Sequence, residues 1–203
     1  VSDDGTGTSD TSQNAVYVQD AIIASNATVP STITLGDGAV LRNFGGMSAV
    51  RVTNRAQLVM KSGSVIEDAS SITRSKGDAG SVGPAGAVWL QGSDFEMKNG
   101  AEIKNGNGRA VYADGGEVTV GGTISGITGN PAMWQGKEGT AIHLRNKASG
   151  TLLSGGVIKE ISGTGSSAVY VHTSTLNCNK ESKICGCDSV GILSVYCDSN
   201  WNK

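Results

Sequence analysis

Apolar and polar residues alternate along this chain in short stretches, and one such stretch occurs five times in nearly the same form. In each copy an alanine is followed by an apolar, a variable and again an apolar residue. The copies are AVRV from Ala49, AVWL from Ala87, AVYA from Ala110, AIHL from Ala141 and AVYV from Ala168. A period of two predicts strands whose alternate side chains face a core. Its recurrence predicts a repeat architecture.

A second alternating stretch, a turn and an isoleucine follow each copy. The second stretches begin at Leu58, Phe95, Val118, Thr151 and Leu176, and the isoleucines are Ile66, Ile103, Ile124, Ile158 and Ile184. From alanine to isoleucine the spacing is 14 to 17 residues, whereas from isoleucine to the next alanine it varies from 7 to 21. One part of the repeat is therefore constant and the other accepts insertions. Short strands without intervening helical patterns predict an all-β parallel solenoid whose coils stack about 4.8 Å apart.

Residues 13–25 depart from this repeat and predict a short amphipathic helix that caps the first coil. Asp10 and Gln13 have the spacing of a capping box. The apolar residues of one helical face are Ala15, Val18, Ala21 and Ile22. The alternative is a further coil, because Ala15 to Val18 repeats the AVYV phrase.

Five features of the sequence form a further pattern: VQDAIIAS from Val18, TITLGDGAVLRNFGG from Thr32, GGTISG from Gly121, SGGVIKEISG from Ser154 and the AVYV-type strands. In these features the chain resembles the right-handed parallel β-helix proteins of the pectin-lyase-like superfamily, and most of all Gly-rich microbial surface proteins and adhesins. The resemblance spans nearly the whole chain. It implies one domain over residues 1–203, with a cap at 1–30, stacked coils at 31–175 and a cysteine-containing coil at 176–203. The family includes lyases, hydrolases, tailspikes and adhesins, so the fold alone does not name an activity.

The outward positions of the repeated strands form two columns if the coils stack in register. The first contains Arg51, Trp89, Tyr112, His143 and Tyr170, and the second contains Thr53, Gln91, Asp114, Arg145 and His172. Three interpretations stay open. The rings stabilise the sheet, or they form a sugar-binding platform beside hydrogen-bonding groups, or the face binds a protein.

Two insertions, residues 70–86 and 128–139, lead into the strands that carry Trp89 and His143 and are expected to flank the columns. The second insertion contains Trp134, which is either a loop anchor for a ligand or a lid on the solenoid. The candidate ligand-binding residues are therefore Trp89, Tyr112, Asp114, Trp134, His143, Arg145, Tyr170 and His172.

Composition narrows the classes of function. A net charge of -2 lacks the broad basic surface of most nucleic-acid binders, and no apolar run approaches the roughly 20 residues of a membrane span. The 30 glycines against three prolines predict frequent turns. We therefore expect no nucleic-acid partner and no membrane-spanning segment.

All four cysteines, Cys178, Cys185, Cys187 and Cys197, lie within the last 26 residues. Their spacing matches no familiar zinc site, so we expect two disulfides that staple the C-terminal coil and an extracellular or cell-surface location. A Cys185–Cys187 bridge would close a strained ring, which leaves Cys178 with either Cys185 or Cys187.

The candidate residues favour binding over catalysis. Lyases of this architecture hold calcium with clustered carboxylates, and the hydrolases use paired aspartates, whereas the outward columns offer only Asp114. His143 and His172 occupy outward positions that suit solvated side chains better than metal ligands. We therefore predict no catalytic residue, metal or cofactor, and a non-enzymatic adhesion module for a glycan or a host or neighbouring-cell surface protein. The alternatives are a polysaccharide lyase or glycoside hydrolase, with calcium only for the lyase, and a structural spacer of a larger surface protein.

Overall fold

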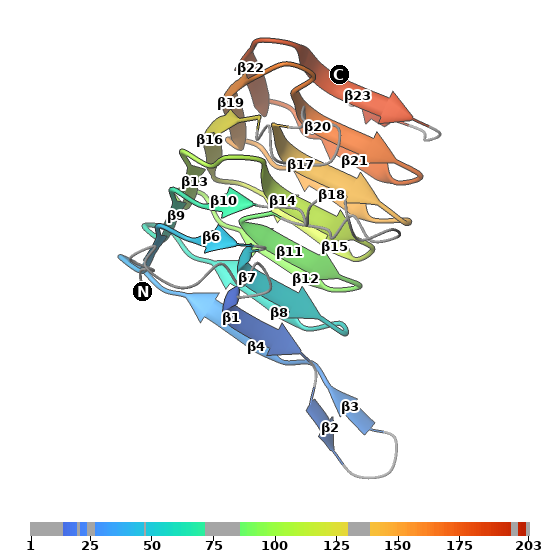
Figure 1. Cartoon of the computed structure of the whole chain (residues 1–203). Coiled ribbons are helices and arrows are strands. Elements are labelled where there is room, and N and C mark those ends of the chain that lie inside the picture. Colours follow the sequence, from blue (N-terminus) through green and yellow to red (C-terminus); the bar gives the residue numbers. More distant parts are fainter. Residues whose placement is uncertain are drawn as a thin grey trace, which may run out of the picture.

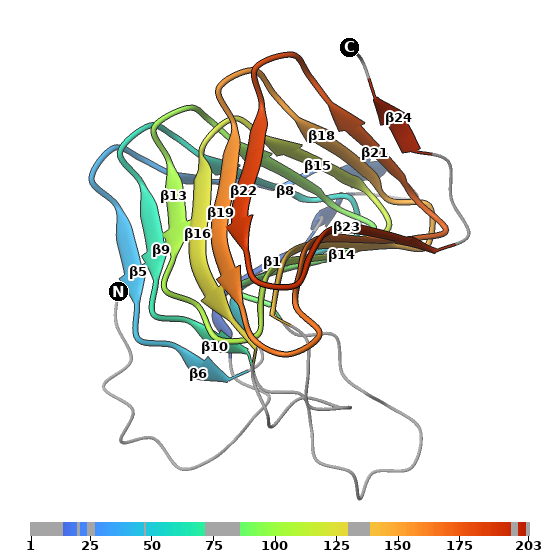
Figure 2. The ribbon, with the colours of Figure 1, turned by 90° about the horizontal axis from the view of Figure 1, so that it is seen from above.

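The computed structural model describes residues 14–19, 21–23, 27–46, 48–71, 86–129, 139–195 and 199–201. These residues form an all-β stack of three parallel sheets around a shared interior (Figures 1 and 2). The first sheet consists of β1 (Asn14–Gln19), β7 (Ser48–Thr53), β11 (Val88–Gln91), β14 (Arg109–Asp114), β17 (Thr140–Arg145), β20 (Ser167–His172) and β23 (Val190–Val195).

The other two sheets follow the same order of coils. The second consists of β4 (Thr32–Leu35), β8 (Gln57–Met60), β12 (Asp94–Met97), β15 (Glu117–Val120), β18 (Ser149–Leu152), β21 (Thr175–Cys178) and β24 (Ser199–Trp201). The third consists of β5 (Val40–Arg42), β9 (Val65–Glu67), β13 (Glu102–Lys104), β16 (Thr123–Thr128), β19 (Val157–Ser162) and β22 (Lys183–Cys187). Each strand pairs in parallel with its equivalents in the neighbouring coils, which is the arrangement of a parallel β-helix solenoid.

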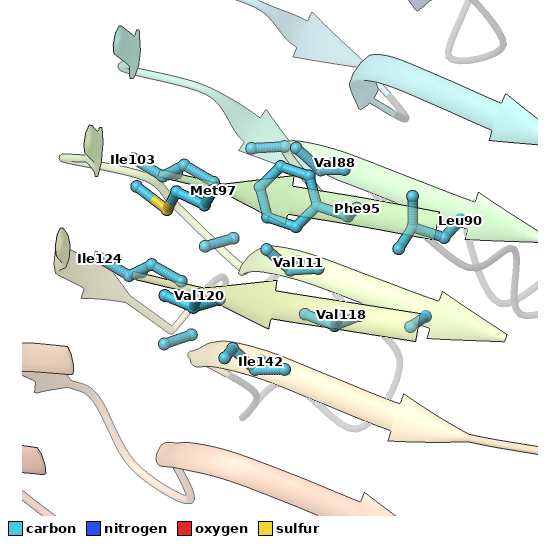
Figure 3. Close-up of a cluster of buried hydrophobic side chains, with 14 of the residues drawn as sticks. Val88, Leu90, Phe95, Met97, Ile103, Val111, Val118, Val120, Ile124 and Ile142 are labelled. Atoms are coloured by element: carbon cyan, nitrogen blue, oxygen red, sulfur yellow. The ribbon is translucent and has the colours of Figure 1, made fainter. Parts of the chain in front are cut away.

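The repeat found in the sequence corresponds to these coils. The alanine phrases form strands of the first sheet, the second stretches lie in the second sheet, and the isoleucines lie in the third. Ile103, for example, pairs with Ile66 on one side and with Ile124 on the other. Equivalent apolar side chains therefore stack on one another, and Ile66, Ile103 and Ile124 are at most 1% exposed. Figure 3 shows this packing around Phe95 and Met97 in the middle of the stack.

One corner of every coil needs a left-handed backbone conformation. The residue directly after the first three positions of each third-sheet strand has a φ between 54° and 63°. These residues are Asn43, Asp68, Asn105, Gly126, Glu160 and Gly186. Because asparagine, aspartate and glycine tolerate this conformation best, the corner explains part of the unusual composition of the chain.

The predicted N-terminal helix is wrong. Asn14–Gln19 form β1, Ala21–Ile23 form β2, and no helix occurs in the described part of the chain. The alternative prediction, that this segment belongs to a further coil, is confirmed for β1, because its Val16 and Val18 pair in parallel with Val50 and Val52 of β7. An isolated helix of this length is marginal in water, whereas a strand here receives hydrogen bonds from the sheet. Asp10 and Gln13 lie outside the described residues.

A short antiparallel hairpin follows β1. Its strands are β2 and β3 (Ala27–Val29), and it projects from the stack in Figure 1. Two further short strands, β6 (Gly45–Gly46) and β10 (Ser70–Ser71), pair in parallel beside the third sheet. No helix among the described residues is long and apolar enough to span a bilayer.

The predicted disulfides between Cys178 and either Cys185 or Cys187 are not formed, because all three cysteines have free thiols. Cys178 is buried in β21, where it belongs to the apolar core. Cys185 lies on β22 one residue after the inward Ile184 and is exposed. Alternation along β22 thus directs Cys185 away from the interior that holds Cys178. Cys197 lies outside the described residues.

Candidate functional site

The first sheet places the predicted outward side chains in register. Trp89 pairs with Arg51 of the preceding coil and with Tyr112 of the following one. Tyr112 pairs with His143, and His143 pairs with Tyr170. We call these five residues the ring column.

A second set of side chains lies two positions later on the same strands. Gln91 pairs with Thr53 and Asp114, and Asp114 pairs with Arg145. His172 occupies the equivalent position of β20. We call Thr53, Gln91, Asp114, Arg145 and His172 the polar column.

The ring column is held together by direct stacking. The Arg51 guanidinium lies 4.0 Å from the centre of the Trp89 ring, within the range of a cation–π interaction. The ring centres of Tyr112 and His143 are 4.9 Å apart, and those of His143 and Tyr170 are 4.5 Å apart, both tilted by about 50°. Tilted ring pairs at these distances stabilise a sheet beyond the area that they bury.

Most of the ring column is buried, which corrects the expectation of a solvated platform. Trp89, Tyr112 and His143 are only 4%, 3% and 8% exposed, although Trp89 and Tyr112 lie outside the apolar core cluster. The alanines at the start of the same strands are also buried. Alternation identifies the face of a side chain, but it carries no information on what lies over that face. Tyr170 and His172 remain half-buried and accessible.

Burial and positive neighbours keep His143 neutral. Loss of hydration, together with the charges of Arg109, Arg145 and His172, lowers the pKa of His143 to about 2. The prediction of a solvated histidine is therefore wrong for this residue. Two buried polar atoms of the column, Nε1 of Trp89 and Nδ1 of His143, have no hydrogen-bond partner in the described part of the structure.

Hydrogen bonds connect the polar column to the ring column. Arg51 donates from Nη2 to Oε1 of Gln91 at 2.7 Å. Arg145 donates from Nη1 to the Tyr112 hydroxyl at 3.0 Å, and its Nε lies 3.8 Å from Oδ1 of Asp114. Burial raises the pKa of Tyr112 despite these positive charges, so its hydroxyl stays protonated. These contacts thus hold the polar side chains of the two columns in place along the stack.

Two residues that sequence reasoning missed contribute to the site. Arg109 places its guanidinium 5.1 Å from the centre of the Tyr112 ring, and Asn146 donates a hydrogen bond to the Asp114 carboxylate. Arg109 directly precedes Ala110, the first residue of the AVYA phrase, and Asn146 directly follows Arg145 of the polar column. Both residues are therefore adjacent in sequence to predicted site positions. Trp134 and most of both insertions lie outside the described residues.

The site combines hydrogen-bond donors, acceptors and one accessible ring. It offers a carboxylate, guanidinium groups, an amide and an accessible tyrosine ring, which together donate, accept and stack. Among the residues that the structure describes, no three histidine, cysteine or acidic side chains are grouped as metal ligands. Comparison with protein-family models, curated proteins and solved structures gives no match.

Proposed function

We propose that this chain is a non-enzymatic binding module of an extracellular or cell-surface protein of the right-handed β-helix type. Its partner is a glycan of a host or neighbouring cell, and the contact runs along the polar column. Tyr170 supplies the stacking surface.

The observation that carries this proposal is the partly exposed polar column. The side chains of Asp114 and Arg145 are 28% and 43% exposed, and they occupy paired positions of neighbouring coils. Each is already oriented by a hydrogen bond, to Asn146 and to Tyr112. Polar groups held in one geometry lose little entropy on binding, and a saccharide hydroxyl both donates and accepts.

The buried rings act as the support of this surface. Trp89 and Tyr112 are nearly inaccessible, so they position Arg51 and Arg145 and do not themselves stack on a sugar. This assignment differs from the expectation drawn from the sequence, in which Trp89 and Tyr112 were contact residues.

A glycan array, followed by titration of the selected saccharide, tests the proposal. We expect Arg145→Ala and Tyr170→Ala each to weaken binding by about 1 to 3 kcal/mol with little change in melting temperature. Lys159→Ala, on the third sheet, is the matched surface control and should bind like the parent. Trp89→Ala should instead lower the unfolding free energy by about 3 kcal/mol, because a buried ring is removed.

A calcium-dependent polyuronate cleavage assay separates binding from turnover. Under our proposal no cleavage occurs, and Asp114→Ala only weakens attachment. Cleavage that disappears in Asp114→Ala would replace the binding module with a lyase or hydrolase. Unchanged saccharide affinity in both Arg145→Ala and Tyr170→Ala would show that the polar column is not the contact surface.

A further inference from the structure

The turn that leads from the second sheet to the third has the same form in five coils. In each, the amide of the fourth residue donates to the carbonyl of the first, over residues 36–39, 61–64, 98–101, 153–156 and 179–182. The third residue has a φ between 69° and 82°. A type II turn needs such a φ at this position, which favours glycine. Four of the five turns have one: Gly38, Gly63, Gly100 and Gly155.

The turn between β12 and β13 places an asparagine directly before this glycine. Asn99 and Gly100 are both exposed. The hydrogen bond that closes the turn comes from the amide of Ala101, which lies 3.1 Å from the carbonyl oxygen of Lys98. No group in the described part of the chain accepts a hydrogen bond from the Gly100 amide. The Gly100 nitrogen is therefore accessible to the side chain of Asn99.

An asparagine followed by glycine can lose its side-chain amide without an enzyme. The Gly100 nitrogen forms a bond to Cγ of Asn99, the bond from Cγ to Nδ2 breaks, and Nδ2 leaves as ammonia with the proton that the Gly100 nitrogen gives up. Water then opens the cyclic imide at one of its two carbonyls, which gives aspartate or isoaspartate. Glycine favours the first step because it has no Cβ to hinder the approach.

The same coil contains two further pairs of this kind, Asn105–Gly106 and Asn107–Gly108. The Gly108 amide donates to the carbonyl of Thr128 at 2.7 Å, and the Asn107 amide donates to the carbonyl of Ala69 at 2.9 Å. These partners belong to the following and the preceding coil. The nitrogen that would have to attack Asn107 is therefore already held in a hydrogen bond.

Asn105 is exposed, but its backbone is fixed at the left-handed corner of the coil, with a φ of 54°. Its amide donates to the carbonyl of Ser125 at 3.0 Å. Gly106 is buried, and its carbonyl accepts from the amide of Thr128 at 2.9 Å. Closure of the imide at this pair therefore requires the corner to open first, which costs free energy and slows the reaction.

We propose that Asn99 is a site of spontaneous modification, at which the folded chain converts to aspartate and isoaspartate, and that the isoaspartyl form loosens the stack. The Gly100 carbonyl accepts from the Gly63 amide of the preceding coil at 2.9 Å. Isoaspartate makes the main chain one carbon longer at this point and displaces that carbonyl. Aspartate leaves the main chain unchanged, and Asp37 already occupies the equivalent position of another turn. The proposal does not depend on glycan binding.

Incubation of the fresh, folded chain in water enriched in heavy oxygen, at mildly alkaline pH, tests the site. Each conversion incorporates the label, and peptide mass mapping over time gives a rate for each asparagine. Asn99 should convert first, and Asn105 and Asn107 at least about tenfold more slowly, because their segments must open. In urea above the unfolding midpoint most of this difference should disappear, since the three asparagine–glycine pairs are then chemically alike.

Asn99→Ser is the matched control, because Ser62 and Ser154 occupy the equivalent position of other turns. Its circular dichroism should match that of the parent, and labelling at Asn105 and Asn107 should be unchanged. Equal rates at the three asparagines of the folded chain, or faster labelling at Asn105 or Asn107, would overturn the assignment of the site.

The effect on the stack is measured on the modified chain itself. Ion-exchange chromatography separates chains that have gained the negative charge, and electron-transfer fragmentation identifies those that contain isoaspartate. Their urea midpoint should lie below that of the parent, whereas Asn99→Asp, which carries the charge on an unaltered main chain, should unfold like the parent. Equal midpoints of the isoaspartyl chain and Asn99→Asp would overturn the proposed loosening of the stack.

Discussion

At the scale of single residues, the left-handed corner that follows the first three positions of each third-sheet strand has one unfavourable occupant. Glu160 has a φ of 58° there, while the equivalent residues of the other coils are asparagine, aspartate or glycine. A residue with a long side chain pays about 1 to 2 kcal/mol for this conformation. Its ion pair with Lys159, at 3.5 Å, is exposed and compensates little.

Glu160→Gly should therefore raise the unfolding free energy by roughly 0.5 to 1 kcal/mol, because relief of the strain exceeds the entropy that glycine adds to the unfolded chain. Urea denaturation measures the change. Glu117→Gly in β15, where φ is not positive, is the control and should be destabilising by a similar amount. Equal destabilisation in both variants would mean that the corner is not strained.

His143 makes stability depend on pH through its burial. Its pKa is about 2 in the folded chain and 6.5 without the fold, so between these values the unfolded chain binds a proton that the folded chain does not. The contribution of the neutral His143 to the free energy of unfolding is therefore fully present above the unfolded pKa, and it decreases as the pH falls below that value. The slope is about 1.4 kcal/mol per pH unit, or a loss of about 2 kcal/mol by about pH 5.

His143→Gln removes this titration and should lose about 2 kcal/mol less than the parent between about pH 7.5 and pH 5. Urea denaturation at the two pH values gives the difference directly, even if the variant is less stable at both. His172→Gln is the control, since His172 is half-buried. Identical pH dependence in the parent and His143→Gln would show that the imidazole is hydrated.

At the scale of elements, the sequence predicted strands and faces where alternation and recurrence agreed. The phrases around Val111 and Ile142 form strands of one sheet, and both residues point inward as expected. The segment Asn14–Gln19 fits both a helical and a strand period. Only its pairing with β7, a contact distant in sequence, decides between them.

The left-handed corner also has a signal in the sequence. Asn43, Asp68 and Asn105 each stand two residues after the aliphatic residue of a third-sheet strand, and this constant spacing marks the left-handed corner. Ile127 and Ile161 extend β16 and β19 and are fully buried, although they lie in the part of the repeat with variable length. The burial of Trp89 had no such signal, because alternation describes one strand and burial depends on everything packed around it.

At the scale of the whole molecule, the stack is a one-dimensional array in which each coil contacts mainly its neighbours. A coil in the middle is held on both sides, whereas the partly buried core residues Ile33, Ala39, Ile184, Cys187 and Ile192 lie in coils at the two ends. In such arrays the end units open at lower free energy than the centre. The free cysteines report on one end of the described stack.

Cysteine alkylation in increasing urea should show this gradient. In the native state Cys185 should react first because it is exposed, and Cys178 last because it is buried and burial raises its pKa. Cys178 should then become reactive below the urea midpoint of global unfolding, as the terminal coils open.

The control is Met97→Cys in the central strand β12, where the native side chain is fully buried. That thiol should react only with global unfolding, measured by circular dichroism, and peptide mass mapping identifies each site. If Cys178 and the introduced thiol react at the same urea concentration, the solenoid unfolds as one cooperative unit and its end is no weaker than its centre.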